Sequence, residues 1–260
     1  MNTCTFAGVM LTLKKSLGQH FLKDETVSQR IVDFLQEKPL SKLLEIGPGG
    51  GALTKYLVNI AGIDLKCIEV DKEKVDFLLK TYPSLKDSII HQSVLDADPP
   101  FAGPFTVVGN FPYNISTEIL FKMLDWKDSL ETMIGMFQRE VAMRIAAKEG
   151  NKVYGVTSVL LQAFFRVDYL FEVDEKAFLP PPKVKSAVIR LIPLVEHVHF
   201  KDKRSFFILV KTAFNQRRKT LRNAVRGLFP PGQLEDELFS KRAEQLSVAD
   251  FAALTFRMNQ

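Results

Sequence analysis

Cysteine is scarce in this chain of 260 residues, since only Cys4 and Cys67 are present and they lie far apart. We therefore expect no disulfide framework, and a reducing compartment, the cytoplasm, is the predicted location. No apolar run approaches the roughly 20 residues that cross a bilayer, so no membrane contact is expected. No cluster of cysteines or carboxylates accompanies His197 and His199, so no metal site is expected. These absences leave an ordinary globular protein.

The positive charge of the chain is concentrated in one segment. The net charge is +5, but residues 201–230 alone contain nine Lys or Arg side chains and a single acid, Asp202. At helical spacing, a basic stripe separate from the apolar positions is expected through Lys211, Arg218, Arg222 and Arg226. Such a segment favours a polyanionic partner, although a solvated helix face is the alternative.

Short apolar runs alternate with helical patterns between residues 41 and 191, which predicts a doubly wound α/β domain with a mostly parallel sheet. Seven strands are expected, at 43–46, 65–69, 88–91, 105–108, 132–137, 165–173 and 184–192. The last two are not separated by a helix and are expected to pair antiparallel at a sheet edge. Later helices are expected at 204–215, 217–228, 233–245 and 247–257. We therefore predict an α/β domain over residues 1–195, with 1–13 as a flexible extension, and a small all-helical domain over residues 196–260.

A glycine-rich turn follows the first expected strand, with the sequence Glu45-Ile46-Gly47-Pro48-Gly49-Gly50-Gly51. Glycines let the backbone turn sharply and come close to a ligand, as in dinucleotide-binding loops. Pro48 removes a backbone N–H that a pyrophosphate cradle would use. This favours S-adenosylmethionine, which has no phosphates, while a ligand-free turn is the alternative.

Glu69 ends the second expected strand, 22 residues after Gly47. A carboxylate at this place can accept both ribose hydroxyls of an adenosine-bearing cofactor. Asp71 competes for the role, but it suits the N-cap of the following helix better.

The segment Asn110-Phe111-Pro112-Tyr113 follows the fourth expected strand, where ligands collect in open α/β sheets. An exocyclic base amine is a poor nucleophile because its lone pair is delocalised into the ring. The Asn110 side-chain oxygen and the Phe111 carbonyl can accept its two N–H groups. Pro112 would hold the loop rigid, and Tyr113 offers a stacking face for a flipped base. We expect methyl transfer to a base amine here, and a simple turn with a packed tyrosine is the alternative.

A proline-rich segment from Phe178 to Ser186 predicts a stiff extended loop. Phe178 could form a second wall for the base opposite Tyr113, although an ordinary rigid loop is the alternative. Together with the basic segment, this loop supplies the residues expected to contact RNA phosphates: Lys183, Lys185, Lys211, Arg217, Arg218, Lys219, Arg222 and Arg226.

Taken together, these motifs resemble the ribosomal RNA adenine dimethyltransferase family over about residues 14–258. The matching segments are Leu17 to Leu22, Glu45 to Gly49, Asn110 to Ser116, Gln138 to Ala142, Phe178 to Ser186 and Asn215 to Asn223. The run from Arg217 to Asn223 favours the branch that dimethylates two adjacent adenosines near the 3′ end of small-subunit (16S) rRNA. Macrolide-resistance methylases of the large subunit share the earlier motifs.

The resemblance implies a Rossmann-like class I methyltransferase domain and S-adenosylmethionine as cofactor. It implies that Tyr113 and Phe178 sandwich the target adenine. It also implies cofactor contacts from His20, Leu22, Gly47, Gly49, Glu69, Ser93 and Asn110.

Two positions depart from the family pattern. Ser93 stands where the family usually has an Asp that meets the adenine amine of the cofactor, and Asp96 or Asp98 would substitute if the loop were shifted. Phe111 stands where the family usually has Leu, which leaves the backbone carbonyl unaffected. The first departure is expected to weaken cofactor affinity without abolishing the chemistry.

The expected function is dimethylation of small-subunit rRNA, within an immature 30S subunit, by a monomeric enzyme. A large-subunit adenine methylase and a non-enzymatic RNA-binding assembly factor are the alternatives, the latter supported by Ser93. A nicotinamide-dependent dehydrogenase is disfavoured by Pro48 and by the basic helical tail.

Overall fold

The computed structural model describes residues 3–6, 9–12, 20–196 and 198–259. Leu17 to Gln19 of the first family motif and His197 lie outside the described residues. The chain divides into two compact units. The first contains residues up to Ala142 together with Asp168–Pro193, and the second contains Met143–Val167 and the residues from Leu194 onward.

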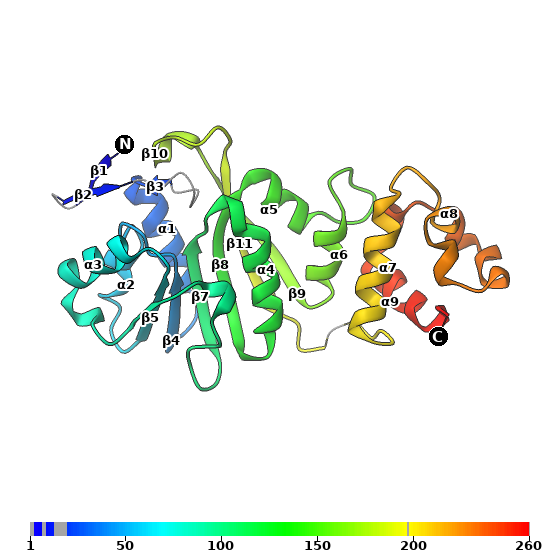
Figure 1. The fold of residues 1–260 in the computed structure, drawn as a ribbon, viewed down its shortest axis with the longest axis horizontal. Coiled ribbons are helices and arrows are strands. Elements are labelled where there is room, and N and C mark those ends of the chain that lie inside the picture. The colour runs from blue at the N-terminus through cyan, green and yellow to red at the C-terminus, as the bar shows by residue number, and fades with distance from the viewer. Residues whose placement is uncertain (1–2, 7–8, 13–19, 197, 260) are drawn as a thin grey trace. The chain divides into compact units, whose positions relative to one another are not determined.

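The first unit is built on a seven-stranded sheet (Figure 1). Its strands lie in the order β6 (Ile89–His91), β5 (Asp64–Glu69), β4 (Lys42–Ile46), β7 (Phe105–Asn110), β8 (Leu130–Gln138), β11 (Ser186–Pro193) and β9 (Phe165–Val173). The pairs from β6 to β8 are parallel, and β11 is antiparallel to β8. The predicted mostly parallel sheet is therefore confirmed, and the carboxyl ends of β4, β5 and β7 meet at one edge.

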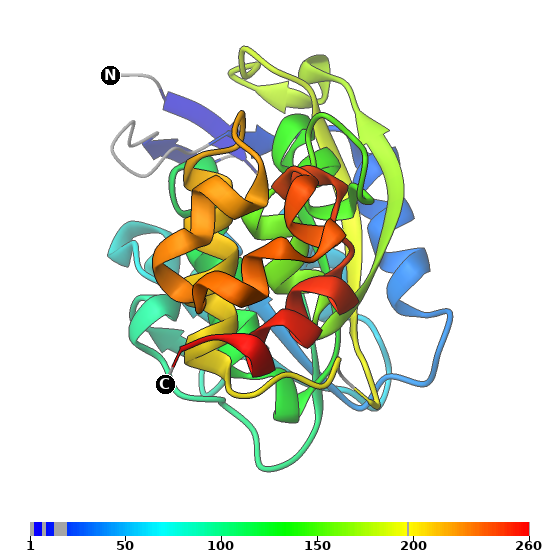
Figure 2. The ribbon, with the colours of Figure 1, turned by 90° about the vertical axis from the view of Figure 1, so that its right-hand side faces the viewer.

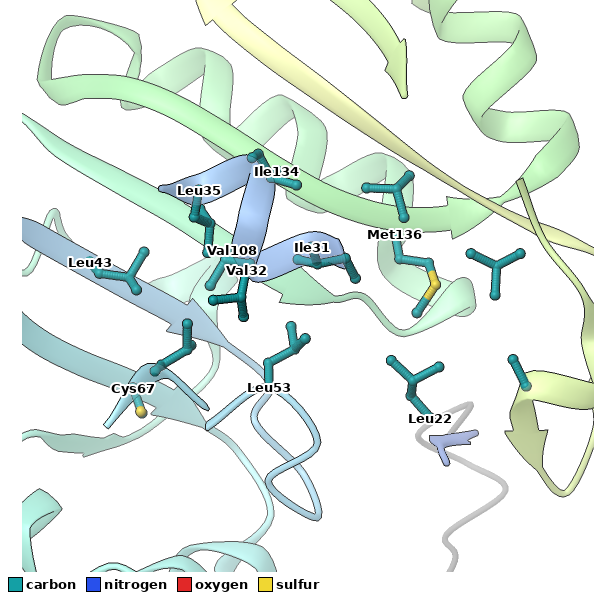
Figure 3. Close-up of a cluster of buried hydrophobic side chains, with 14 of the residues drawn as sticks. Leu22, Ile31, Val32, Leu35, Leu43, Leu53, Cys67, Val108, Ile134 and Met136 are labelled. Atoms are coloured by element: carbon teal, nitrogen blue, oxygen red, sulfur yellow. The ribbon is translucent and has the colours of Figure 1, made fainter. Parts of the chain in front are cut away.

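Four helices accompany these strands: α1 (Glu25–Leu35), α2 (Thr54–Leu57), α3 (Lys72–Thr81) and α4 (Ser116–Asp125). The buried face of α1 packs on the sheet, since its Val32 and Leu35 belong to one apolar cluster with Val108 of β7 and Ile134 of β8 (Figure 3). Burial of such side chains stabilises the fold by about 1.5–3 kcal/mol each. The sheet is thereby held rigid under the loops at its carboxyl edge.

The sequence predicts that Asp71 caps α3 and that Ser116 or Thr117 caps α4, and these two predictions have different outcomes. Asp71 caps α3 as predicted, because its side chain accepts a hydrogen bond from Glu73 N. Ser116 does not cap α4 but is its first helical residue, and its hydroxyl donates to the Tyr113 carbonyl at 3.1 Å. That bond ties the start of α4 to the preceding loop.

Two pairs of short strands lie outside the main sheet. β1 (Thr3–Phe6) and β2 (Val9–Thr12) pair antiparallel within the segment expected to be a flexible extension, while residues 1–2, 7–8 and 13 lie outside the described residues. β3 (Phe21–Leu22) pairs with β10 (Phe178–Leu179), so the segment before α1 is held beside the proline-rich loop.

The second unit is helical, and Figure 2 shows its residues from 203 onward in yellow to red. Its helices are the end of α5 (Arg139–Ala146), α6 (Val156–Gln162), α7 (Lys203–Asn215), α8 (Leu221–Val225) and α9 (Val248–Leu254). Residues 143–167, which the sequence placed in the first domain, cluster here because Tyr154 packs edge-on against Phe214 and Gly150 N donates to Glu244 O. Ser247 with Asp250 three residues later is a predicted helix start. It is confirmed, because the Ser247 hydroxyl accepts from Asp250 N at 3.1 Å.

The expected continuous helices over 217–228 and 233–245 are wrong. The chain turns after α7, where Lys219 N donates to Gln216 O, and Leu221 N is held by Lys241 O. Residues 231–235, 237–240 and 243–245 form separate 3₁₀ turns. Lys211 and Arg222 therefore lie on different helices, and the single basic stripe does not exist.

No helix within the described ranges is long and apolar enough to span a membrane. Across the same ranges, no group of three or more His, Cys, Asp or Glu side chains is arranged to hold a metal ion.

Candidate active site

A cavity of about 270 Å³ lies at the carboxyl edge of β4, β5 and β7. Its walls come from five segments of the first unit: 20–22, 45–53, 68–70, 92–95 and 110–119. Ten residues that the sequence predicted as functional line it: His20, Leu22, Gly47, Gly49, Glu69, Ser93, Asn110, Phe111, Pro112 and Tyr113. The fold therefore gathers residues that are up to 93 positions apart in sequence, from His20 to Tyr113.

The glycine turn after β4 adopts backbone angles that favour glycine. Gly47 and Gly49 have φ of 66° and 55°, in the left-handed region that side-chain-bearing residues rarely adopt. Nothing lies within 4 Å of the place where a Gly47 Cβ would stand, so the backbone forms an open wall of the cavity. The Gly47 N–H donates to Ile68 O at 2.9 Å, which fixes the turn to β5.

Glu69 links the glycine turn to the following helix. Its Oε2 accepts from Gly49 N at 3.0 Å and its Oε1 accepts from Asp71 N at 2.9 Å. The side chain is 5% exposed, and this burial raises the pKa of the carboxyl. Each carboxylate oxygen has a second lone pair, so Glu69 can still accept hydrogen bonds from a bound diol.

Glu45 is a second buried acid at the cavity, and its environment could not be predicted from the sequence. Its Oε2 accepts from the Thr54 hydroxyl at 2.7 Å, and the Cys67 thiol lies 3.9 Å from the same oxygen. Burial, reinforced by the charge of Glu69, raises its pKa to about 7. Glu45 is therefore partly protonated near neutral pH.

The Glu45→Gln variant is expected to change how stability depends on pH. Glu45 ionises near pH 4.5 when unfolded and near 7 when folded, so its contribution is complete below pH 4.5 and is lost as pH rises through 7. We expect wild type to lose on the order of 3 kcal/mol relative to Glu45→Gln between pH 4.5 and 8. Urea unfolding of both proteins across this range measures the difference, and parallel pH profiles would contradict a protonated Glu45.

Asn110 is the last residue of β7, and a hydrogen bond to a backbone carbonyl fixes the orientation of its side-chain amide. Its Nδ2 donates to the His20 carbonyl at 3.3 Å. The side-chain oxygen is therefore the end that is left to accept a hydrogen bond from a bound molecule. Such an acceptor at the cavity wall is what activation of an amine requires.

Phe111 is buried between two glycines of neighbouring strands. A Cβ at Gly135 would lie 2.2 Å from the Phe111 ring, and one at Gly109 would lie 2.6 Å from it. The ring also packs on Phe137, with centroids 5.1 Å apart. The space above these glycines accommodates Phe in place of the Leu that the resemblance implies, and the buried ring anchors the loop.

Gly135→Ala is expected to lower the free energy of unfolding by about 1–3 kcal/mol, because its methyl group would displace the Phe111 ring. Gly232→Ala is the matched control, since nothing lies within 4 Å of its Cβ position. Urea unfolding compares the two, and equal midpoints would contradict the close packing.

Tyr113 is held at both its hydroxyl and its ring. The hydroxyl shares a hydrogen bond of 2.5 Å with the Ser186 hydroxyl, and burial raises its pKa. The His20 ring stacks on it with centroids 5.5 Å apart, while His20 Nδ1 lies 2.9 Å from Pro180 O. Ser186 had no sequence signal of its own, since its role depends on a contact between residues 73 positions apart.

Phe178 lies elsewhere than the sequence suggested. It is 1% exposed and belongs to the apolar cluster around Leu22, because pairing of β10 with β3 directs it into the core. It does not line the cavity, so the expected placement opposite Tyr113 is not found.

The loop after β6 contains the position where an acid was expected. Ser93 lines the cavity, and its hydroxyl accepts from Leu95 N at 3.2 Å to cap residues 94–96. Asp96 and Asp98 are exposed and do not line the cavity, so neither replaces the acid. Gln92 does line it, which the sequence reasoning missed.

The expected RNA-contacting side chains are exposed or half-buried and differ in their partners. Arg217 lies 3.6 Å from Glu244, Arg222 lies 3.9 Å from Glu235, and Lys185 lies 3.6 Å from Asp174. The side chains of Lys183, Lys211, Arg218, Lys219 and Arg226 are exposed.

The sheet, the glycine turn and the acid at the end of β5 define a class I methyltransferase. Solved structures share the fold: a dimethyladenosine transferase from Plasmodium falciparum has a TM-score of 0.76 at 24% identity, covering 89% of this chain and 94% of that one. The 23S rRNA methyltransferase ErmE has a TM-score of 0.67 at 24% identity, covering 92% and 100%.

Residues 10–259 match the family described as ribosomal RNA adenine dimethylase, and the chain belongs to this family. A ribosomal RNA small subunit methyltransferase A from Cytophaga hutchinsonii is 51% identical over 247 residues, which cover 93% of this chain and 95% of the relative. The resemblance derived from the motifs is thus confirmed. The non-enzymatic and dehydrogenase alternatives are not favoured.

Proposed function

We propose that this protein transfers methyl groups from S-adenosylmethionine to the N6 amines of two adjacent adenosines near the 3′ end of small-subunit rRNA. The observation that carries the proposal is the Asn110 amide, oriented by His20 so that its oxygen is available at the cavity wall. The wording "small subunit" in the name of the 51% identical relative supports the small-subunit substrate over a large-subunit one.

The cavity fits an adenosine-bearing cofactor. Glu69 has acceptor positions for a ribose diol, and the open backbone at Gly47 leaves room for close approach. His20, Leu22, Gly49 and Ser93 complete the proposed binding surface. When bound, the cofactor supplies an electrophilic methyl group on a positively charged sulfur.

The protein's own residues then position the acceptor amine. Asn110 Oδ1 and the Phe111 carbonyl accept its N–H groups, so the nitrogen lone pair points toward the methyl carbon. Pro112 and the buried Phe111 ring keep these acceptors fixed, and Tyr113 stacks on the base. Methyl transfer to the amine held by these residues would replace the carbon–sulfur bond of the cofactor by a nitrogen–carbon bond, and the amine would then release one proton to solvent.

The partner is proposed to be an immature 30S particle in the cytoplasm, bound by a monomer. The basic residues of the second unit, with Lys183 and Lys185, contact RNA phosphates in this proposal. Arg218 and Lys219 are exposed, whereas Arg217 and Arg222 each lie near an acid. The charges of Arg218 and Lys219 are therefore more available to phosphates than those of Arg217 and Arg222.

The double variant Arg218→Ala/Lys219→Ala is expected to weaken rRNA binding and to lower the slope of log affinity against log salt by about 1–2. Lys86→Ala, which removes an exposed charge from the first unit, is the control. Filter binding at several salt concentrations gives the slopes, and an unchanged slope in the double variant would contradict the proposed contacts.

Labelled methyl transfer tests the proposed substrate. Small subunits and large subunits from a strain lacking the modification are each incubated with the enzyme and methyl-labelled S-adenosylmethionine. We expect label in the small subunit alone. Label in the large subunit instead would overturn the small-subunit assignment.

A further inference from the structure

The pairing of β5 with β6 brings an apolar residue, Val70, and a polar one, Gln92, to one end of the cavity. Glu69 is the register partner of His91 in these parallel strands, and His91 Nε2 lies 3.2 Å from Val70 O. The next residues, Val70 and Gln92, therefore leave the sheet side by side, one step beyond Glu69. Both line the cavity, and Val70 is 52% exposed although it is apolar.

This end of the cavity has no acid to recognise a base. Among the described residues that line the cavity, the only carboxylates are Glu45 and Glu69, and both are buried and hydrogen-bonded to the chain. The Ser93 hydroxyl accepts from Leu95 N, so one of its acceptor positions is occupied. Gln92 is exposed, and its carboxamide is the larger neutral polar group there.

We propose that the Gln92 carboxamide recognises the adenine of the cofactor, with Val70 lying against the ring. The inference rests on the proposed function, since it requires an adenosyl cofactor in this cavity. Adenine presents a donor, its N6 amine, beside ring-nitrogen acceptors. A carboxamide offers the complementary acceptor and donor, whereas a carboxylate offers acceptors only. Gln92 thus recognises the adenine, to which the single short hydroxyl of Ser93 offers fewer hydrogen bonds.

The order of the residues supports this assignment. Glu69 suits the ribose, and the base of a nucleoside is attached directly to that ribose. Val70 and Gln92 come directly after the last residues of β5 and β6, which are register partners, and both line the cavity, which suits contact with the base. An exposed valine at this edge is explained if an aromatic ring covers it.

The proposal is tested by removing the Gln92 side chain and the N6 amine of the ligand, separately and together, and measuring the affinity in each case. The affinities of wild type, Gln92→Ala and Ser93→Ala are measured by calorimetry for S-adenosylhomocysteine and for its purine analogue, in which hydrogen replaces the N6 amine. We expect wild type to prefer S-adenosylhomocysteine by about tenfold or more, and Gln92→Ala to lose most of this preference. Thermal unfolding verifies that the variants fold, which the exposure of Gln92 favours.

Two outcomes would overturn the inference alone. Gln92→Ala could retain the full preference for the amine, or Ser93→Ala could abolish it while Gln92→Ala does not. Failure of wild type to bind S-adenosylhomocysteine at all would instead contradict the proposed function, so the two failures are distinguishable.

Discussion

Asn110→Ala is expected to lower the rate of methyl transfer to small subunits by about 10²–10³-fold, the usual effect of removing one preorganised polar group that acts on the reacting atoms. The alanine cannot accept the N–H of the target amine, so the lone pair is no longer directed at the methyl carbon. Binding of rRNA should be unchanged, because the proposed phosphate contacts lie in other segments. Single-turnover rates and filter binding, measured on the same preparation, check both parts.

Asn59→Ala is the matched control for this variant, since Asn59 is exposed and its amide caps the Lys55 carbonyl away from the cavity. The control should transfer methyl groups at the wild-type rate. A rate for Asn110→Ala within threefold of wild type would show that another group directs the amine.

Glu69→Gln is expected to weaken the binding of S-adenosylhomocysteine by on the order of 100-fold. The glutamine side chain has one acceptor oxygen, but Glu69 accepts from both Gly49 N and Asp71 N. The amide NH₂ would therefore face a backbone N–H, which lowers the free energy of unfolding by about 1–3 kcal/mol in the free and the bound protein alike. The loss of affinity arises because the same substitution replaces the charged acceptor for the ribose diol by a neutral amide.

Calorimetry measures this change directly, and Glu237→Gln, an exposed acid in the second unit, is the control. We expect the control to bind as wild type does. An affinity of Glu69→Gln within a few-fold of wild type would mean that the ribose lies elsewhere in the cavity.

Local patterns in the sequence predicted the parts of the site that depend on strand ends. Gly47 and Glu69 each follow a strongly apolar run, and parallel strands bring such positions to one edge. Their meeting at a cavity could therefore be inferred without coordinates. The Asp71 and Ser247 caps were predictable for a similar reason, because a cap depends on residues only two or three positions away.

Features that depend on distant contacts could not be predicted in this way. The burial of Phe178 follows from pairing between segments more than 150 residues apart. The late start of the helix expected over 217–228, which begins only at Leu221, follows from the bond between Leu221 N and Lys241 O. The raised pKa of Glu45 likewise reflects what surrounds it in space. In each case the local sequence allowed two conformations or environments, and tertiary packing selected one.

The packing of Phe111 depends both on its local sequence position and on distant contacts. Its place after β7 was evident from the sequence, but the space that receives its ring is made by Gly135 on β8 and Gly109 on β7. Those glycines interrupt two otherwise apolar strands, a signal that a ring or a backbone approaches closely. The acceptor loop is thereby fixed to the centre of the sheet.

The most direct test of the central claim is nucleoside analysis of small-subunit RNA after incubation with the enzyme and S-adenosylmethionine. The RNA is digested, and methylated nucleosides are quantified by mass spectrometry for wild type and Asn110→Ala. We predict two N6,N6-dimethyladenosines per particle with wild type and almost none with Asn110→Ala. Methyl groups on any other nucleoside, or equal dimethyladenosine from both proteins, would contradict the role of the Asn110–Tyr113 segment as the acceptor site.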